Sequence, residues 1–214
     1  MTGAGPVRTA VHLVRHGEVH NPEHILYGRL PGYGLSETGQ GQARRVAEHL
    51  ASADVTALFV SPMQRAQETA APIAEKLGVE PITDERLIEA ANAFEGQYVG
   101  VGDGALRRPE FWPLLRNPFR PSWGEPYLEI AHRMLGAAHR ARAAGAGHEA
   151  VCVSHQLPIW TLRRFLAGQR LWHSPTQRQC ALGSVTTLLF DDESLADIAY
   201  TEPSGTSDPS ATGA

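Results

Sequence analysis

Residues 7–15 read VRTAVHLVR and lead directly into His16 and Gly17. β-Branched and apolar residues dominate this stretch, which is typical of a buried strand, and the glycine ends the pattern. The next segment, 17–35, has no clear periodicity and contains Asn-Pro and Pro-Gly turn pairs. Long irregular segments in compact domains are often functional, so we expect a functional loop to begin where the strand ends.

Strands and helices are predicted to alternate along the rest of the chain. Ser36 is a suitable N-cap for a helix over 37–51 that has one apolar face. Ser61 and Pro62 predict a second helix, with the serine as N-cap and the proline at the first helical position, ending at Gly78. The other predicted elements are strands at 56–60, 81–83, 150–153, 184–190 and 195–200, and helices at 125–144 and 157–166. This alternation predicts an α/β fold, a three-layer α/β/α sandwich around a mostly parallel sheet.

The chain has 214 residues and is predicted to contain a single domain over residues 1–200. Within it, residues 91–124 are rich in glycine, proline and aromatic side chains, and we expect this excursion to pack on the domain. Residues 201–214 are mainly Ser, Thr, Pro and Gly without core residues, which predicts a disordered tail.

Composition excludes several classes of function. A formal charge of −4 argues against nucleic acid as a partner. The two cysteines, Cys152 and Cys180, stand alone, so neither a disulfide framework nor a zinc site is expected. Residues 1–10 lack the apolar run of a signal peptide, and no stretch approaches the roughly 18 apolar residues that span a bilayer. We expect a cytoplasmic protein without a membrane partner, and its oligomeric state stays open.

Charged side chains follow three of the predicted strands. Arg15 and His16 come at the end of the first, Arg65 lies shortly after the second, and His155 follows the strand at 150–153. Because the carboxyl ends of strands in an open α/β sheet line one crevice, these side chains can converge into an anion site. An arginine can fork two hydrogen bonds to phosphate oxygens, and a charge-assisted bond contributes roughly 1.5–3 kcal/mol. Arg65 also lies in the first turn of its helix, where exposed N–H groups favour an anion.

His16 is the expected nucleophile. Neighbouring cations disfavour protonation of its imidazole, which keeps it reactive near neutral pH. Gly17 is expected to let the backbone approach closely and to expose an N–H. Attack on phosphorus gives a phosphohistidine while Arg15, Arg65 and His155 hold the equatorial oxygens. This chemistry requires neither a metal ion nor another cofactor.

A leaving alkoxide needs a proton, which calls for a carboxylic acid with a raised pKa. Glu89, just beyond the strand at 81–83, is the candidate. The nearby carboxylates Glu18, Glu85 and Glu95 remain alternatives for this role.

A series of segments, in order and at compatible spacings, resembles the histidine phosphatase superfamily, which includes cofactor-dependent phosphoglycerate mutases. The segments are VRHGE at 14–18, Leu35-Ser36 with Thr38-Gly39, SPMQRAQETA at 61–70, Leu87 with Glu89, and VSH at 153–155. The resemblance covers about residues 10–190 and implies a phosphoglycerate mutase-like fold.

By this resemblance His16 is the phosphorylated nucleophile and Glu89 the proton donor, with Arg15, Arg65 and His155 as phosphate ligands. Asn21 resembles an asparagine that contacts phosphate in many members, although it lies one residue closer to His16 than in the mutases. Gln156 stands where glycine is common after the second histidine, so its side chain is available to line a substrate pocket.

The expected function is a metal-independent phosphatase that hydrolyses a small phosphomonoester through a phosphohistidine at His16. A mutase that returns the phosphoryl group to another hydroxyl of its substrate is the alternative within enzymes. Four arginines of the excursion suit a mutase lid: Arg107, Arg108, Arg116 and Arg120. The excursion does not closely resemble a mutase insert, so hydrolysis is favoured. A non-catalytic module that binds a phospholigand is the third hypothesis.

Overall fold

The computed structural model describes residues 5–97, 109, 112 and 123–205. Six strands of the described chain form one sheet in the order β3-β2-β4-β1-β5-β6. Their bounds are β1 Arg8–Arg15, β2 Val55–Val60, β3 Pro81–Thr83, β4 Glu149–Ser154, β5 Val185–Asp191 and β6 Ser194–Thr201. β1 to β4 run parallel, whereas β5 and β6 are antiparallel to their neighbours. The predicted mostly parallel sheet is therefore confirmed.

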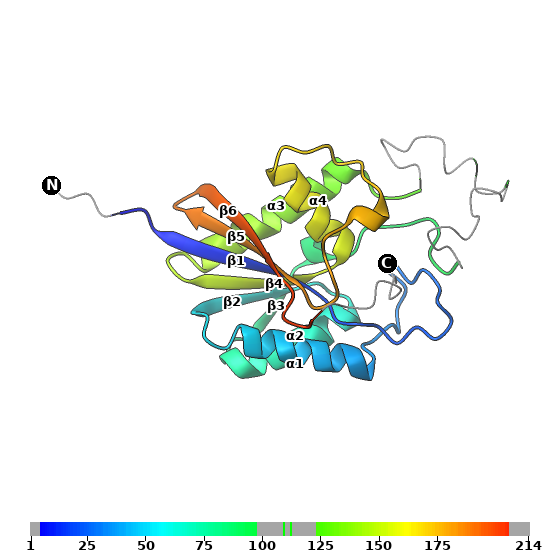
Figure 1. Ribbon diagram of the computed structural model, residues 1–214, viewed down its shortest axis with the longest axis horizontal. Coiled ribbons are helices and arrows are strands. Elements are labelled where there is room, and N and C mark those ends of the chain that lie inside the picture. Colours follow the sequence, from blue (N-terminus) through cyan, green and yellow to red (C-terminus); the bar gives the residue numbers. More distant parts are fainter. Residues whose placement is uncertain (1–4, 98–108, 110–111, 113–122, 206–214) are drawn as a thin grey trace.

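Helices cover both faces of the sheet (Figure 1). α1 (Glu37–His49) and α2 (Gln64–Leu77) lie on one face, and α3 (Tyr127–Ala144) and α4 (Gln156–Leu166) lie on the other. Short 3-10 helices, η1 (Glu85–Leu87) and η4 (Pro175–Gln177), lie in the connections. The three-layer α/β/α sandwich predicted from the alternation of elements is confirmed.

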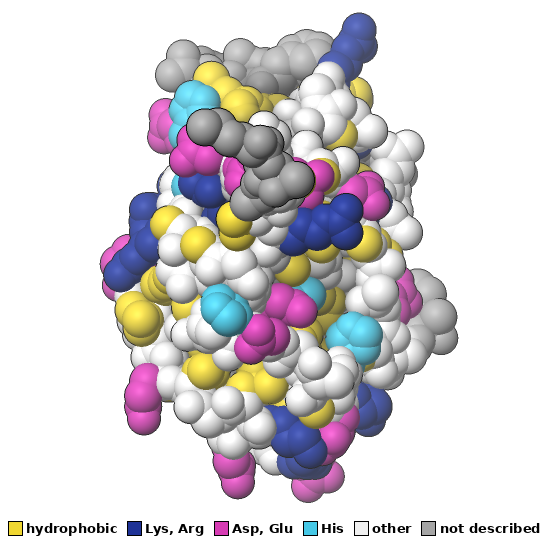
Figure 2. Space-filling model, turned by 90° about the vertical axis from the view of Figure 1, so that its left-hand side faces the viewer, with side chains coloured by type: hydrophobic (Ala, Val, Ile, Leu, Met, Phe, Trp, Pro, Cys, Tyr) yellow, Lys and Arg dark blue, Asp and Glu magenta, His cyan; other side chains and the backbone are white. Residues whose placement is uncertain are grey.

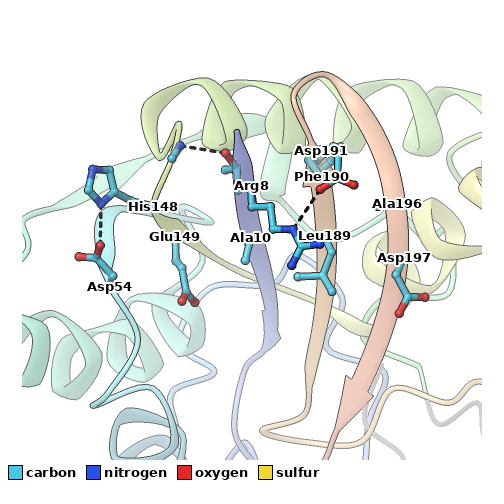
Figure 3. Close-up of a pocket in the computed structure, with 12 residues that line it drawn as sticks. Arg8, Ala10, Asp54, His148, Glu149, Leu189, Phe190, Asp191, Ala196 and Asp197 are labelled. Atoms are coloured by element: carbon cyan, nitrogen blue, oxygen red, sulfur yellow. Dashed lines mark hydrogen bonds and ion pairs between the residues drawn. The ribbon is translucent and has the colours of Figure 1, made fainter. Parts of the chain in front are cut away.

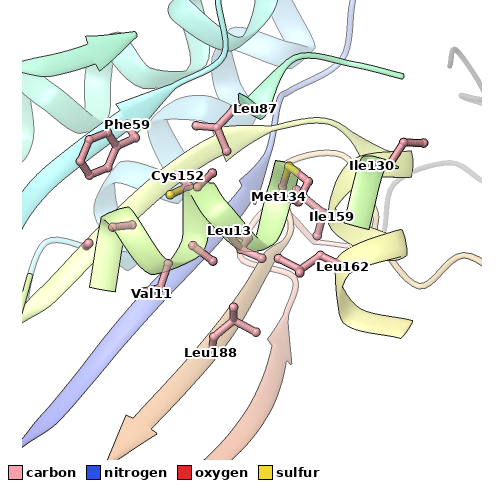
Figure 4. Close-up of a cluster of buried hydrophobic side chains, with 14 of the residues drawn as sticks. Val11, Leu13, Phe59, Leu87, Ile130, Met134, Cys152, Ile159, Leu162 and Leu188 are labelled. Carbon is pink, nitrogen blue, oxygen red and sulfur yellow. The ribbon is translucent and has the colours of Figure 1, made fainter. Parts of the chain in front are cut away.

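Two apolar clusters join these layers. In β1, Val11 and Leu13 pack with Met134 of α3 and Leu162 of α4 (Figure 4). The neighbouring Val14 belongs to the other cluster, which contains residues of α1 and α2. Successive side chains of a strand point to opposite faces, so β1 contributes to both cores. Burial on both faces explains why this strand reads as an almost continuous apolar run.

The start of α2 differs from the prediction. The helix begins at Gln64 after Met63, so Ser61 is not its N-cap and Pro62 is not its first residue. The Ser61 hydroxyl instead lies 2.7 Å from Nε2 of His155, which is fully buried. A buried imidazole nitrogen without a partner costs about 1–3 kcal/mol, at least as much as the roughly 1 kcal/mol that a cap contributes. In this position the hydroxyl is directed at His155 and makes no capping bond to the first turn of the helix.

Parts of the predicted excursion and tail lie outside the described residues. These include Arg107, Arg108, Arg116 and Arg120 of the 91–124 excursion and residues 206–214. β6 continues through Thr201, and the Ser204 hydroxyl lies 3.3 Å from the carbonyl oxygen of Gly183. Within the described ranges, no helix combines the length and apolar character that crossing a bilayer requires.

Candidate active site

The carboxyl ends of β1, β2 and β4 lie at one end of the sheet, where they meet the α2 and α4 N-termini (Figure 1). This edge gathers the four predicted anion ligands and the predicted acid, and none is more than 4% exposed: Arg15, His16, Arg65, His155 and Glu89. The rings of the two histidines are 5.1 Å apart, centroid to centroid. The expected convergence of distant segments is therefore observed.

The tautomer of His16 follows from its hydrogen bonds. Nδ1 lies 2.7 Å from the carbonyl oxygen of Gly17, which only accepts, so Nδ1 carries the proton. Nε2 then has the lone pair and accepts a bond of 3.3 Å from Nε of Arg65. Burial first, then the charges of Arg65 and Arg15, lower the pKa of His16 well below 6.5. The imidazole is therefore neutral at pH 7 and directs an unprotonated nitrogen toward a guanidinium.

Each guanidinium of the cluster is fixed by the protein and keeps a nitrogen free. Arg65 donates from Nη2 to the carbonyl of Gly28 at 2.7 Å and lies over the ring of Tyr27. Arg15 donates from Nη1 to the carbonyl of Cys180 at 2.7 Å. Neither Nη1 of Arg65 nor Nε of Arg15 has a hydrogen-bond partner in the described structure. The role of Cys180 was not anticipated, since nothing local in the sequence marks it.

His155 is held between Ser61 and Glu89. The Ser61 hydroxyl oxygen accepts a long bond of 3.4 Å from the Met63 N–H, and its proton is available for Nε2 of His155. When the hydroxyl donates this proton to Nε2, His155 carries its own proton on Nδ1, which lies 3.9 Å from Oε2 of Glu89. Burial, with the charges of Arg65 and other arginines, lowers the pKa of His155 well below 6.5.

Glu89 has the properties of a proton donor. Its Oε1 accepts from the N–H of Ala90 at 2.7 Å, whereas Oε2 has no hydrogen-bond partner among the described residues. Burial raises the pKa of this carboxyl, and the charge of Arg65 opposes the shift. Of the four candidate carboxylates, Glu89 is the only one that is buried. Glu18 bonds to the Ser36 hydroxyl at the start of α1 instead.

Four polar atoms of this cluster are buried without a hydrogen-bond partner in the described chain: Arg15 Nε, Arg65 Nη1, His155 Nδ1 and Glu89 Oε2. Buried polar groups are normally hydrogen-bonded, so four such atoms together mark a binding site. The first three are N–H donors, and a protonated Glu89 provides a fourth. A compact anion with several oxygens matches this set, and the described residues offer no group of three or more metal-ligating side chains.

Gly17 behaves differently from the prediction in one respect. Its N–H is not exposed but donates to Oγ1 of Thr69 at 3.1 Å, and Thr69 in turn donates to the carbonyl of Arg65. The expected close approach is present, because a Cβ on Gly17 would overlap the carbonyl oxygen of Gly39 in α1. Gly17 therefore secures packing between the loop and the helix rather than an anion contact.

Asn21 closes a local turn. Its Nδ2 donates to the carbonyl of Ile25 at 2.9 Å, and its Oδ1 accepts from the Ile25 N–H at 3.3 Å. Nδ2 carries two hydrogens, so the second one remains available for a further acceptor such as a phosphate oxygen. Gln156, by contrast, lies next to the cluster, because its Nε2 donates at 3.3 Å to the same Cys180 carbonyl that Arg15 binds.

A network that sequence analysis missed holds the segment around Glu89. Arg29 donates to the carbonyl of Glu89 at 2.7 Å, and Arg133 donates to that of Ile88 at 2.7 Å. Both arginines pair with Glu125, whose carboxylate is largely buried. Arg29 and Arg133 are both far in sequence from the segment that they hold, so no local pattern could have indicated these bonds.

A separate groove of about 530 Å³ lies at the amino end of β1 (Figure 3). With a rise of roughly 3.3 Å per residue along β1, the groove lies about 25 Å from the cluster. Its carboxylates lie at Asp54, Glu149, Asp191 and Asp197. Acidic, basic and histidine side chains are interspersed on the face at this end (Figure 2). The groove lacks the cationic character of the buried cluster, which is therefore the candidate active site.

Comparisons with known proteins agree with this fold. A family model described as the histidine phosphatase superfamily (branch 1) matches residues 11–200. An uncharacterized protein of Mycobacterium tuberculosis is 61% identical over 198 residues, covering 92% of this chain and 98% of that protein. Phosphoserine phosphatase 1 of Hydrogenobacter thermophilus is 30% identical over 162 residues, covering 73% of this chain and 75% of its own. The structure of a mycobacterial glucosyl-3-phosphoglycerate phosphatase has a similar fold, with a TM-score of 0.70 at 23% identity, and covers 90% of this chain and 97% of its own.

Proposed function

The chain belongs to the histidine phosphatase superfamily, and from this membership we propose that it hydrolyses a small phosphomonoester through a phosphohistidine at His16. The single observation that carries the proposal is the bond from His16 Nδ1 to the Gly17 carbonyl, which leaves Nε2 unprotonated beside Arg65. A neutral imidazole with a fixed lone pair among cations is a nucleophile prepared for an anionic substrate.

In the first step, Nε2 of His16 attacks phosphorus and the bond from phosphorus to the alcohol oxygen breaks. The free N–H groups of Arg15 and Arg65, together with His155, bind the phosphoryl oxygens as their negative charge is redistributed. Asn21 can join them through the second hydrogen of its Nδ2, because the bond to Ile25 uses only one. The proton on Oε2 of Glu89 passes to the departing oxygen, so the alcohol leaves neutral.

In the second step, water attacks the phosphohistidine and the bond from nitrogen to phosphorus breaks. Glu89, now a carboxylate, takes a proton from this water, which restores the starting protonation state. The products are the alcohol and inorganic phosphate, and His16 is again neutral. The groups that act in both steps are side chains of the protein, so neither step uses a metal ion.

The superfamily includes mutases as well as phosphatases, so transfer to a second hydroxyl is the alternative. A mutase must shield its phosphohistidine from water, and the 91–124 excursion does not closely resemble a mutase insert. The phosphoserine phosphatase relative also favours hydrolysis. A non-catalytic phospholigand module is less favoured, since both a nucleophile and a buried acid are present.

The test is hydrolysis of p-nitrophenyl phosphate in the presence of EDTA, with His16→Ala as the matched variant. We expect turnover by the native protein that chelation does not change, and loss of turnover in the variant. An acid-labile phosphoenzyme should form on rapid quenching of the native protein only. Activity that persists in His16→Ala, or that EDTA abolishes, contradicts the mechanism. With 3-phosphoglycerate, isomerised product without free phosphate would establish the mutase alternative.

A further inference from the structure

Arg178 is a partly buried cation without a carboxylate partner in the described structure. Its Nε donates to Nε2 of His173 at 3.0 Å, and its Nη1 donates to Oε1 of Gln156 at 3.2 Å. Both partners are uncharged, in contrast to Arg29 and Arg133, which pair with a common glutamate. A partly buried arginine normally pairs with a carboxylate. The lack of such a partner for Arg178 among the described residues therefore needs an explanation.

The environment of Arg178 keeps it fixed and available. Nδ1 of His173 donates to the Leu171 carbonyl at 2.6 Å, so Nε2 carries the lone pair that receives the guanidinium. Burial is the main cause that lowers the pKa of His173 to about 4, so the ring is neutral at pH 7. Nη2 of Arg178 has no partner in the described part of the chain, and the residue keeps part of its surface open to solvent.

Arg178 is connected to the phosphate-binding cluster through one side chain and one carbonyl. Gln156 accepts from Arg178 and donates to the carbonyl oxygen of Cys180. The same oxygen accepts from Nη1 of Arg15. Burial lowers the pKa of Arg178 and raises the pKa of Glu89, and the attraction between the two opposite charges opposes both shifts. Arg178 is therefore close enough to Glu89, the proposed proton donor to the leaving alcohol, for the two charges to interact.

We propose that Arg178, oriented by Gln156 and His173, binds a carboxylate on the alcohol part of the substrate. A fixed guanidinium suits a planar carboxylate better than it suits a hydroxyl or an amine. The short connection to Arg15 requires the two anionic groups to be close, so the substrates are phosphomonoesters of small hydroxy acids. This inference rests on the proposed phosphatase function and specifies its substrate class.

The test compares pairs of similar phosphomonoesters in which one member has a carboxylate and the other lacks it. One pair is 3-phosphoglycerate with glycerol 3-phosphate, and the second is O-phosphoserine with O-phosphoethanolamine. For the native protein we expect kcat/KM to be roughly 10- to 100-fold higher for the carboxylate member of a pair, from one charge-assisted contact. In Arg178→Gln this ratio should fall to near 1. Loss of the Arg178 charge also affects Glu89, but this influence acts on both members of a pair and cancels in the ratio.

Arg170→Gln is the matched control, because Arg170 is exposed in the loop after α4. It should retain the native ratio. Arg178→Lys keeps the charge but loses the planar guanidinium, so we expect an intermediate ratio. If thermal unfolding shows that Arg178→Gln is misfolded, Arg178→Lys takes its place in the test. A native ratio near 1, or the same ratio in native and Arg178 variants, overturns this inference. His16-dependent hydrolysis of p-nitrophenyl phosphate would still stand in that case, whereas its absence overturns the proposed function itself.

Discussion

Nε2 of His16 lies 3.3 Å from Nε of Arg65, and neither side chain is exposed to solvent. This contact combines two properties that a phosphoryl-transfer nucleophile needs. The guanidinium charge disfavours protonation of the imidazole, and the same arginine can bind the phosphate that the imidazole attacks. The stacking of Arg65 on Tyr27 and its bond to Gly28 fix it in this position.

Arg65→Lys should lower kcat/KM for p-nitrophenyl phosphate by roughly 100-fold, from the loss of one to two charge-assisted bonds. Lysine keeps a charge but cannot bond at once to Gly28, to His16 and to phosphate. Steady-state kinetics and binding of orthovanadate measure the effect. Arg164→Lys, on the half-buried face of α4, serves as the control. Native kinetics in Arg65→Lys would contradict the role given to the guanidinium fork.

Glu89→Gln should reduce kcat/KM for an alkyl phosphate by about 10²- to 10⁴-fold, the usual contribution of a general acid. Glutamine preserves the shape and the bond to the Ala90 N–H but has no proton to transfer. The loss should be much smaller for p-nitrophenyl phosphate, whose leaving group departs without protonation. Equal losses for both substrates would show that Glu89 has a role other than acid catalysis.

The pH profile of kcat/KM should be bell-shaped for an alkyl phosphate. His16 must be unprotonated, and its pKa is lowered, so the acid limb lies well below 6.5. Glu89 must be protonated, and its pKa is raised, so the alkaline limb lies above 4.5. Comparison of the native protein with Glu89→Gln on the same substrate isolates the second limb, which should vanish in the variant. An alkaline limb that persists unchanged would assign it to another group.

Gly39→Ala should destabilise the fold by about 1–3 kcal/mol, the usual cost of overpacking. A Cβ at this position would overlap the backbone carbonyl of Glu18, which has to shift together with the loop after His16. Gly41→Ala in the same helix is the control, because its nearest contact is the flexible end of Arg45 at 3.5 Å. Higher helix propensity should leave that variant neutral or up to about 1 kcal/mol more stable. Urea unfolding of both variants provides the comparison.

The prediction of secondary structure succeeded where local signals were strong. Apolar runs of β-branched residues marked β1 and β4, and Ser36 is the N-cap of α1 as expected, with its hydroxyl accepting from the Gly39 N–H. It failed at the start of α2, which begins at Gln64, while the Ser61 hydroxyl contacts a histidine that follows another strand. Such a contact exists only once the sheet has formed.

The candidate site, too, could be predicted from the sequence only in part. Arg15, His16 and His155 could be selected because strand ends are readable and parallel strands end at a common edge. The environment of Glu89 could not be read from sequence, because Arg29 comes from one distant segment and Glu125 and Arg133 from another. The same holds for the exposed N–H expected at Gly17, which Thr69 of α2 occupies.

The sequence by itself determined the order of strands and helices and the identity of the charged residues at the strand ends. Both depend on residue spacing and backbone preference, which act over a few positions. Only the tertiary structure decided which nitrogen of His16 is unprotonated, which carboxyl is buried, and which arginines lack a charged partner. These properties depend on burial and on hydrogen bonds between distant segments, and the low polarity of the interior turns them into large shifts of pKa.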